Sequence, residues 1–410
     1  MKYCLSLSLL AVLVSLPGQL ISNSYYWDPD GPAGRPVTSF AIDPRDSQTL
    51  YAQTPGRGVY KSKDGGASWA SMSLGLPKYL VRSLVIDPQN PETLYVAGLG
   101  GVFKSINGGK SWGPSNLSSK RTLESPRRLV MDPKNSSTLY YAAISGKVFK
   151  SVDGGKTWNP MSFGLPEYSD VGALAIDPQN TSVLYLGVSF KAGALFKSVN
   201  AAQSWQLSNK GLPHNADGTS LAIDPRKPST LYLGTNNGFF KSADAAQSWK
   251  RIAIGLAQSL RGEDTIYASC ISIDPKDPSI LYMGTEGDGT VESVDRGETW
   301  FPLDMGVLNK DVYSIAIDSH NPKILYAGTF KEAIKSMDGG QSWVPMIAGL
   351  PHSLPTDADE IKNDFVTLND EEADQLKKVT IAFIFVGFLA SLLAYLYFSR
   401  KKRKTSTVQK

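Results

Sequence analysis

Three short elements recur seven times along the 410-residue chain, and this repetition constrains its fold more than any other feature. The first is an apolar run ending in Asp-Pro, or Asp-Ser in the last copy, with its aspartates at Asp43, Asp87, Asp132, Asp177, Asp224, Asp274 and Asp318. The second is a Leu-Tyr pair whose tyrosine follows each aspartate by eight residues, at Tyr51, Tyr95, Tyr140, Tyr185, Tyr232, Tyr282 and Tyr326. The third is Ser-x-Asp/Asn-x-Gly/Ala-x-Ser/Thr-Trp, whose tryptophans are 43 to 51 residues apart. Repeats of this length are typical of propellers and solenoids.

One copy of the repeat can be divided into strands and turns from its local sequence. Four short segments of the first copy have the residues and length of strands, namely 39–42, 49–52, 58–62 and 69–72. The first segment stops at Asp43-Pro44, because proline cannot donate a hydrogen bond within a sheet. No long amphipathic segment suggests a helical solenoid. The repeat therefore predicts an all-β fold, a seven-bladed β-propeller of four-stranded blades over residues 23–352.

The third element has the composition of a self-bonded turn. Its Asp, Asn, Ser and Thr side chains can bond backbone N–H groups, and glycine accepts a positive φ. Its tryptophan can pack between neighbouring sheets. We interpret as structural the pairs Asp64 and Trp69, Asn107 and Trp112, Asp153 and Trp158, Asn200 and Trp205, Asp244 and Trp249, Asp295 and Trp300, and Asp338 and Trp343. Alanines replace the glycines in Asn200-Ala201-Ala202 and Asp244-Ala245-Ala246, which predicts strained or altered turns there.

This turn element resembles the Asp-box, or bacterial neuraminidase (BNR) repeat. Together with Ile-Asp-Pro, Leu-Tyr and Lys-Ser, it resembles the propellers of photosystem II stability/assembly factors and a broader set of bacterial BNR-repeat proteins. Sialidases, xyloglucanases and the sortilin ectodomain share the Asp-box on other propellers. The resemblance covers about residues 39–351. It implies the fold strongly and the function weakly.

Catalysis is not expected, and no catalytic residue, metal ligand or cofactor is assigned. Sialidases typically begin with Phe/Tyr-Arg-Ile-Pro, whereas the nearest segment here, Gly34-Arg35-Pro36-Val37, lacks the aromatic residue and the isoleucine. Glycosidases need two carboxylates that face one another. Acidic residues on predicted connections, such as Asp170, Asp217, Asp264 and Asp311, have no spacing that shows convergence. Three histidines leave little for a metal centre, and two cysteines cannot form a disulfide scaffold.

Both ends of the chain carry membrane-targeting patterns. An apolar run after Lys2 predicts a signal peptide over residues 1–22. The uncharged segment 379–398 is long enough for a transmembrane helix, and the basic residues that follow predict a cytoplasmic tail, 399–410. Residues 353–378 hold eight acidic residues and read as a solvated stalk. The expected topology is a single membrane span with the propeller outside the cytoplasm.

The net charge supports this division. The formal charge of +4 divides into +2 for the propeller, −5 for the stalk, +6 for the tail and +1 for the signal peptide. The propeller is therefore nearly neutral, which disfavours a nucleic-acid partner.

A partner is expected on the face where the links between blades and the loops between second and third strands gather. Five residues before the repeat aspartate, copies two and three carry arginine, which places Arg82 and Arg127 near one rim on adjacent blades. The candidate partner-binding residues are Arg82, Arg127, Arg128, Arg261, Tyr267 and Tyr313. The assembly-factor resemblance implies such an arginine patch for docking a protein, and the alternative is a pair of solvated loop arginines.

Two functions therefore remain. The first is a membrane-anchored extracytoplasmic scaffold that binds a protein or peptide and performs no chemistry. The second is an extracytoplasmic glycan-binding or glycoside-hydrolase-like protein related to sialidases or xyloglucanases.

Overall fold

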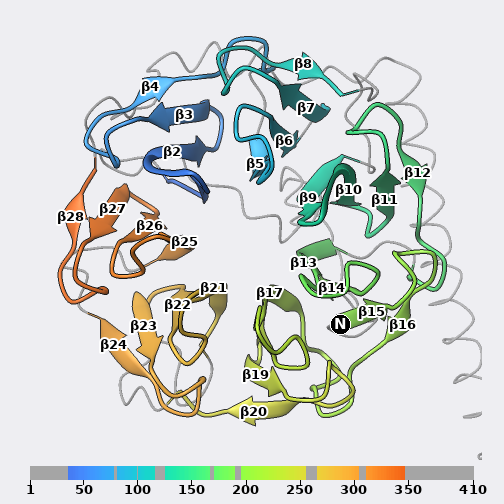
Figure 1. The fold of residues 1–410 in the computed structure, drawn as a ribbon. Helices are drawn as coiled ribbons and strands as arrows, with labels where there is room; N and C mark the ends of the chain where they lie inside the picture. The colour runs from blue at the N-terminus through green and yellow to red at the C-terminus, as the bar shows by residue number, and fades with distance from the viewer. Residues whose placement is uncertain are drawn as a thin grey trace, which may run out of the picture. The chain divides into compact units, whose positions relative to one another are not determined.

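The predicted propeller is present. The computed structural model describes residues 36–77, 81–98, 100–115, 125–166, 170–189, 195–254, 266–303 and 311–346. These residues form seven four-stranded antiparallel sheets, arranged as blades around a central axis (Figure 1). This confirms an all-β, seven-bladed propeller of four-stranded blades.

The predicted segments at the two chain ends are not part of this description. The signal peptide, the stalk, the transmembrane helix 379–398, the tail and Arg261 lie outside the described residues. Within the described residues, no helix is long and apolar enough to cross a membrane.

Each blade is built from four consecutive strands, ordered from the axis outward. Blades 1 and 2 comprise β1 (Ser39–Asp43), β2 (Asp46–Thr54), β3 (Gly58–Ser62), β4 (Ala70–Ser71), β5 (Val81–Ile86), β6 (Leu94–Gly98), β7 (Gly101–Ser105) and β8 (Gly113–Pro114). Blades 3 and 4 comprise β9 (Pro126–Asp132), β10 (Asn135–Ala143), β11 (Val148–Ser151), β12 (Asn159–Pro160), β13 (Asp170–Ile176), β14 (Leu184–Ser189), β15 (Leu195–Ser198) and β16 (Gln206–Leu207). Blades 5 to 7 comprise β17 (Gly218–Ile223), β18 (Leu231–Thr235), β19 (Gly238–Ser242), β20 (Lys250–Ile252), β21 (Ala268–Ile273), β22 (Leu281–Thr285), β23 (Thr290–Ser293), β24 (Phe301–Leu303), β25 (Val312–Ile317), β26 (Leu325–Thr329), β27 (Ala333–Ser336) and β28 (Val344–Pro345).

The hydrophobic core lies between the blades rather than within any one of them. Leu50 and Tyr51 of β2 are almost fully buried, because neighbouring blades cover both faces of the second strand. Tyr51 packs with Leu94, Val96 and Trp112 of blade 2. The indole nitrogen of Trp112 in turn donates to the Met72 carbonyl of blade 1, at 2.6 Å. The Leu-Tyr and tryptophan elements therefore bind each blade to its neighbour.

The ring closes by docking of blade 1 against blade 7, without a shared strand. The Val37 amide donates to the Thr329 carbonyl at 3.2 Å, just before β1 begins. Val37 and Trp69 pack with Tyr326 in one apolar cluster. Lys335 of blade 7 donates to the Gly65 carbonyl of blade 1 at 2.8 Å. The closing joint thus uses the same contacts as an internal joint.

The third repeated element is a self-bonded turn in all seven blades. In blade 1, Ser62 Oγ donates to Asp64 Oδ1 at 2.7 Å and accepts the Gly66 amide at 2.8 Å. The Ser68 amide donates to Asp64 Oδ1 at 2.8 Å. These bonds, led by the one from the Ser68 hydroxyl, lower the pKa of Asp64 to about 2. The hydrogen bonds of the turn therefore stabilise the ionised form of the Asp64 carboxylate.

The two alanine-containing turns keep this hydrogen-bond pattern under strain. Ala202 has φ 68° and Ala246 has φ 67°, in the left-handed region that favours glycine. The Ala202 amide still donates to Ser198 Oγ at 3.0 Å. The predicted strain is present, and the geometry of the turn is retained.

Candidate functional site

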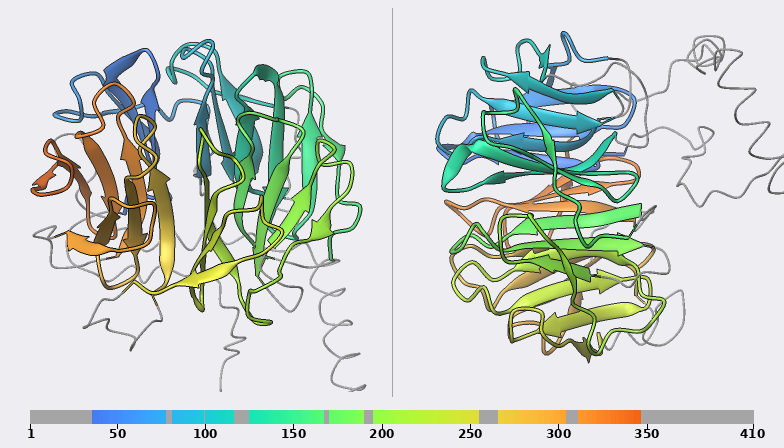
Figure 2. Two further views of the ribbon diagram at one scale, coloured as in Figure 1. Left: turned by 60° about the horizontal axis from the view of Figure 1, so that its bottom comes forward. Right: turned by 90° about the vertical axis from the view of Figure 1, so that its right-hand side faces the viewer.

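The antiparallel order of the strands divides the propeller into two faces. One face carries the starts of the innermost strands and the loops between second and third strands; we call it the loop face. The opposite face carries the turns between first and second strands and between third and fourth strands; we call it the turn face. Figure 2 shows the strands running between these faces.

Arg82 and Arg127 are bulged residues at the loop-face end of their strands. In β5, Val81 pairs with Gly98 and Ser83 with Ala97, so that Arg82 is the extra residue. In β9, Pro126 pairs with Ala143 and Arg128 with Ala142, so that Arg127 is the extra residue. The same repeat position is the extra residue in blades 4 to 7. A bulge re-aims its side chain, which the repeat alignment alone could not show.

The arginines of β9 reach to blade 4. Arg127 forms an ion pair with the carboxylate of Asp170, which also accepts the Val171 amide at 3.0 Å. Arg128 donates through Nε to the Gly172 carbonyl at 2.7 Å. Among the described residues, the Nη1 and Nη2 groups of Arg128 make no hydrogen bond.

The charges of neighbouring side chains act on Arg128. The pKa of Arg128 is lowered to about 10, first because burial removes it from water and then because Arg127 and Arg82 carry like charges nearby. Asp170 and Tyr267 act on Arg128 in the opposite direction. We call Arg82, Arg127, Arg128 and Asp170 the arginine cluster. Arg128 remains partly exposed to solvent.

Four of the six predicted partner-binding residues are linked by their electrostatic effects. The charges of Arg82, Arg127 and Tyr267 all act on Arg128, and Tyr267 immediately precedes β21 of blade 6. Tyr313 occupies the corresponding bulge of β25 in blade 7. Asp170, which the sequence offered only as a scattered acidic residue, is part of the cluster.

A second recurring arrangement was missed by the sequence reasoning. In six blades a lysine of the third strand lies over the ring of the repeat tyrosine, at 4.8 to 5.8 Å from its centroid. In blade 1, Lys61 Nζ and the Tyr51 hydroxyl both donate to the Gly108 carbonyl of blade 2, at 3.3 and 3.1 Å. We call this arrangement the Tyr–Lys pair. The repeated Lys-Ser dipeptide was its only sequence signal.

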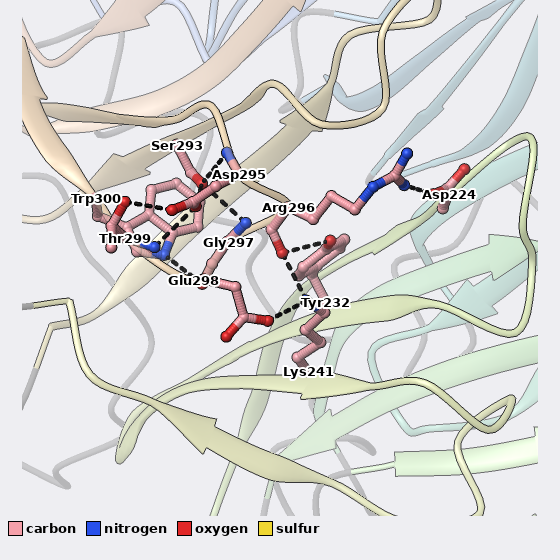
Figure 3. A network of polar contacts seen from close by, with 10 residues as sticks. All are labelled: Asp224, Tyr232, Lys241, Ser293, Asp295, Arg296, Gly297, Glu298, Thr299 and Trp300. Atoms are coloured by element: carbon pink, nitrogen blue, oxygen red, sulfur yellow. Dashed lines mark hydrogen bonds and ion pairs between the residues drawn. The ribbon is translucent and has the colours of Figure 1, made fainter.

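One polar network on the turn face is structural. At the joint of blades 5 and 6, the Arg296 carbonyl accepts the Tyr232 hydroxyl and Lys241 Nζ, each at 2.8 Å (Figure 3). The Arg296 guanidinium reaches Asp224 at 3.2 Å, and Lys241 pairs with Glu298 at 2.7 Å. These groups satisfy one another, so this network joins blades and offers little to a ligand. The described residues contain no cluster of three or more potential metal ligands.

Comparisons with known proteins support the fold. No protein-family model matches the chain, and no curated protein matches it by sequence. A GH74 xyloglucanase from Xanthomonas campestris matches with a TM-score of 0.66 and 20% identity over 79% of this chain. This chain spans 56% of that enzyme and 55% of the GH74 enzyme of Niastella koreensis.

A second kind of similar structure has almost the length of this propeller. YCF48 bound to D1 peptide matches with a TM-score of 0.58 and 16% identity, over 76% of this chain and 95% of that chain. YCF48 from Cyanidioschyzon merolae matches with a TM-score of 0.56 and 13% identity, over 75% of this chain and 97% of that chain. At these identities the similarity shows a shared seven-bladed propeller fold.

Proposed function

We propose that this chain is a binding scaffold without chemistry of its own. It is a membrane-anchored propeller, held outside the cytoplasm by the helix 379–398, that receives a carboxylate-bearing peptide of a protein partner on its loop face. The arginine cluster carries this proposal, because among the described residues Arg82, Arg127 and Arg128 lie near one another and near Asp170 at the loop-face ends of β5, β9 and β13.

Arg128 is suited to hold a carboxylate. Its Nε contact with Gly172 fixes the direction of the guanidinium. A planar guanidinium can offer two parallel N–H groups to one carboxylate, and such charge-assisted bonds are short and strong. The negative charge of a bound carboxylate would also reduce the electrostatic repulsion that Arg82 and Arg127 exert on Arg128.

The YCF48 structures support a peptide as the ligand class. One of them holds a D1 peptide, and the two match nearly their whole length with this propeller. The membrane anchor and the outward orientation rest on the sequence pattern of the two chain ends.

The alternative is an extracytoplasmic glycan-binding or glycoside-hydrolase-like protein, which the GH74 similarity favours. A glycosidase needs a pair of carboxylates on either side of the scissile bond. Asp170, the carboxylate of the arginine cluster, is already bonded to Arg127 and to the Val171 amide. We therefore favour the scaffold.

Peptide binding by the full chain in detergent tests this proposal. The probe is a fluorescent 12-residue peptide with two C-terminal glutamates and a free carboxylate, compared with its amidated, glutamine-substituted counterpart. Arg128→Gln should weaken binding of the acidic peptide by about 10- to 100-fold, as expected from loss of a charge-assisted bond. Arg45→Gln, on the turn face, is the matched control. Equal affinity in wild type and Arg128→Gln would contradict the proposal.

Membrane topology is tested in intact cells that produce the protein. External protease should remove the propeller and leave the tail 399–410 intact. Protection of the propeller would contradict the outward orientation.

A further inference from the structure

Charge is distributed unevenly around the loop face. The described part of this face consists of the loops between second and third strands and the segments where the innermost strands begin. In blades 1 to 3 these residues include five basic side chains and no acidic one: Arg57, Arg82, Arg127, Arg128 and Lys147. We call this part of the loop face the basic pole.

The other side of the ring has the opposite sign. In blades 4 to 7 the described residues at the same positions include one basic side chain, Lys331, and six acidic ones: Asp170, Asp217, Glu286, Asp288, Asp311 and Glu332. Asp170 pairs with Arg127 where the two regions meet. We call the acidic residues of blades 5 to 7 the acidic pole. The small net charge of the propeller hides this separation.

Backbone bonds hold both poles in place. In four blades, a loop residue donates its amide to the carbonyl of the residue at or just before the start of the innermost strand. The pairs are Ile144 to Ser125, Asn236 to Asp217, Glu286 to Tyr267 and Phe330 to Asp311, at 3.0 to 3.4 Å. The charged loops therefore sit beside the strands that surround the axis. Their charges belong to a preformed surface.

Asp217 is an example of this preorganisation. Its side chain accepts Asn236 Nδ2 at 3.0 Å, and its amide donates to Asn236 Oδ1 at 2.8 Å. Asn237 of the same loop donates to the Asn215 carbonyl at 3.0 Å. The carboxylate of Asp217 is thus held on the loop face rather than left to sample many positions.

From this distribution we infer that the loop face binds its peptide in one orientation. The acidic end lies over the basic pole of blades 1 to 3, and a basic segment lies over the acidic pole of blades 5 to 7. This inference rests on the proposed function of the arginine cluster and adds to it the charge pattern of the partner. The reversed orientation places like charges together at both ends, which is how interfaces exclude a wrong register.

Screening makes the two poles act separately. The Debye length in physiological salt is about 8 Å, so each pole acts mainly on the part of the peptide that lies above it. Affinity should therefore depend on the charge at both ends of the peptide, and each dependence should map to its own pole.

Three 12-residue peptides test the inference on the full chain in detergent. All share two C-terminal glutamates with a free carboxylate, and their other ends carry two lysines, neutral residues or two glutamates. The lysine-ended peptide should bind roughly three- to tenfold more tightly than the neutral one, and the glutamate-ended peptide more weakly. The double variant Glu286→Lys/Asp288→Lys brings the summed charge of the acidic pole and Lys331 from −4 to 0, so it should largely abolish this order. Glu92→Lys, an acid-to-base change on the turn face, should keep it.

The outcomes separate this inference from the function on which it rests. Binding that requires Arg128 but is equal for all three peptides overturns the orientation alone, as does an unchanged order in the double variant. No binding of any peptide to the wild type, or binding indifferent to Arg128→Gln, overturns the proposed function and the orientation together. Equal melting temperatures of the variants and wild type establish that the propeller remains folded.

Discussion

Blade 6 lacks a Tyr–Lys pair, and restoring it should stabilise the propeller. Glu292 occupies the lysine position of β23, within hydrogen-bonding reach of the Tyr282 hydroxyl. The Tyr282 hydroxyl also lies 3.4 Å from the Gly339 carbonyl of blade 7, the longest such contact among the described blades that have one. In blade 7, by contrast, Lys335 Nζ donates to the Gly65 carbonyl of blade 1 at 2.8 Å. We predict that Glu292→Lys strengthens the joint between blades 6 and 7.

The size of the effect follows from the two interactions that the lysine would gain. A cation–π contact at a partly exposed site contributes about 0.5–1 kcal/mol. A hydrogen bond from a charged donor contributes about 1.5 kcal/mol, which partial exposure reduces. The sum is about 1–2 kcal/mol. With an unfolding entropy of about 2.1 cal/mol/K per residue over about 310 residues, this raises Tm by roughly 2–3 °C.

Differential scanning calorimetry on purified full-length protein measures this shift. The companion variant Lys104→Met removes the pair from blade 2, where Lys104 lies 5.0 Å from the Tyr95 centroid, and should lower Tm by a similar amount. An unchanged Tm in Lys104→Met, or an unchanged or lower Tm in Glu292→Lys, would refute the reasoning.

Three further predictions concern stability. Trp158→Ala removes an indole that packs edge-on against Tyr141, with the ring centroids 4.8 Å apart. This change should cost about 3 kcal/mol of folding stability and lower Tm by several degrees in a thermal melt. An unchanged Tm would refute a structural role for this tryptophan. Ala246 has a φ of 67°, which glycine adopts without strain, so Ala246→Gly should stabilise the propeller by about 0.5–1 kcal/mol in denaturant titration. The control Ala243→Gly should destabilise it. A loss of stability in both variants would show that the turn is not strained. Burial raises the pKa of Glu292 above its usual 4.5. The wild type should therefore lose stability as pH rises through that raised pKa, whereas Glu292→Gln should not. Parallel profiles of stability against pH for the two proteins would contradict this.

Sequence reasoning predicted the propeller well because its determinants are local and repeated. The Leu-Tyr pair and the turn tryptophan recur at fixed offsets, and each packs against the same neighbour in every copy. The strand ends were less predictable. The second strand of blade 1, expected over 49–52, extends over Asp46–Thr54, and the outermost strand shrinks to Ala70–Ser71 because it has a partner strand on one side only.

The candidate site was predictable only in part. The repeat alignment placed Arg82 and Arg127 on adjacent blades, but the bulge that re-aims them depends on the register with the next strand. The partners of the arginines, Asp170 and the Gly172 carbonyl, come from another blade. Ring closure uses the same repeated elements as the internal joints, so no separate sequence pattern marks it.

The central claim, that the loop face binds peptide carboxylates rather than glycans, can be tested in one calorimetric experiment. Full-length protein is titrated with the glutamate-terminated peptide and, separately, with xyloglucan oligosaccharide. The proposed scaffold function predicts binding heat with the peptide, an affinity that Arg128→Gln weakens about 10- to 100-fold, and no binding or hydrolysis of the oligosaccharide. Binding or cleavage of the oligosaccharide that Arg128→Gln leaves unchanged, with no heat from the peptide, would contradict it.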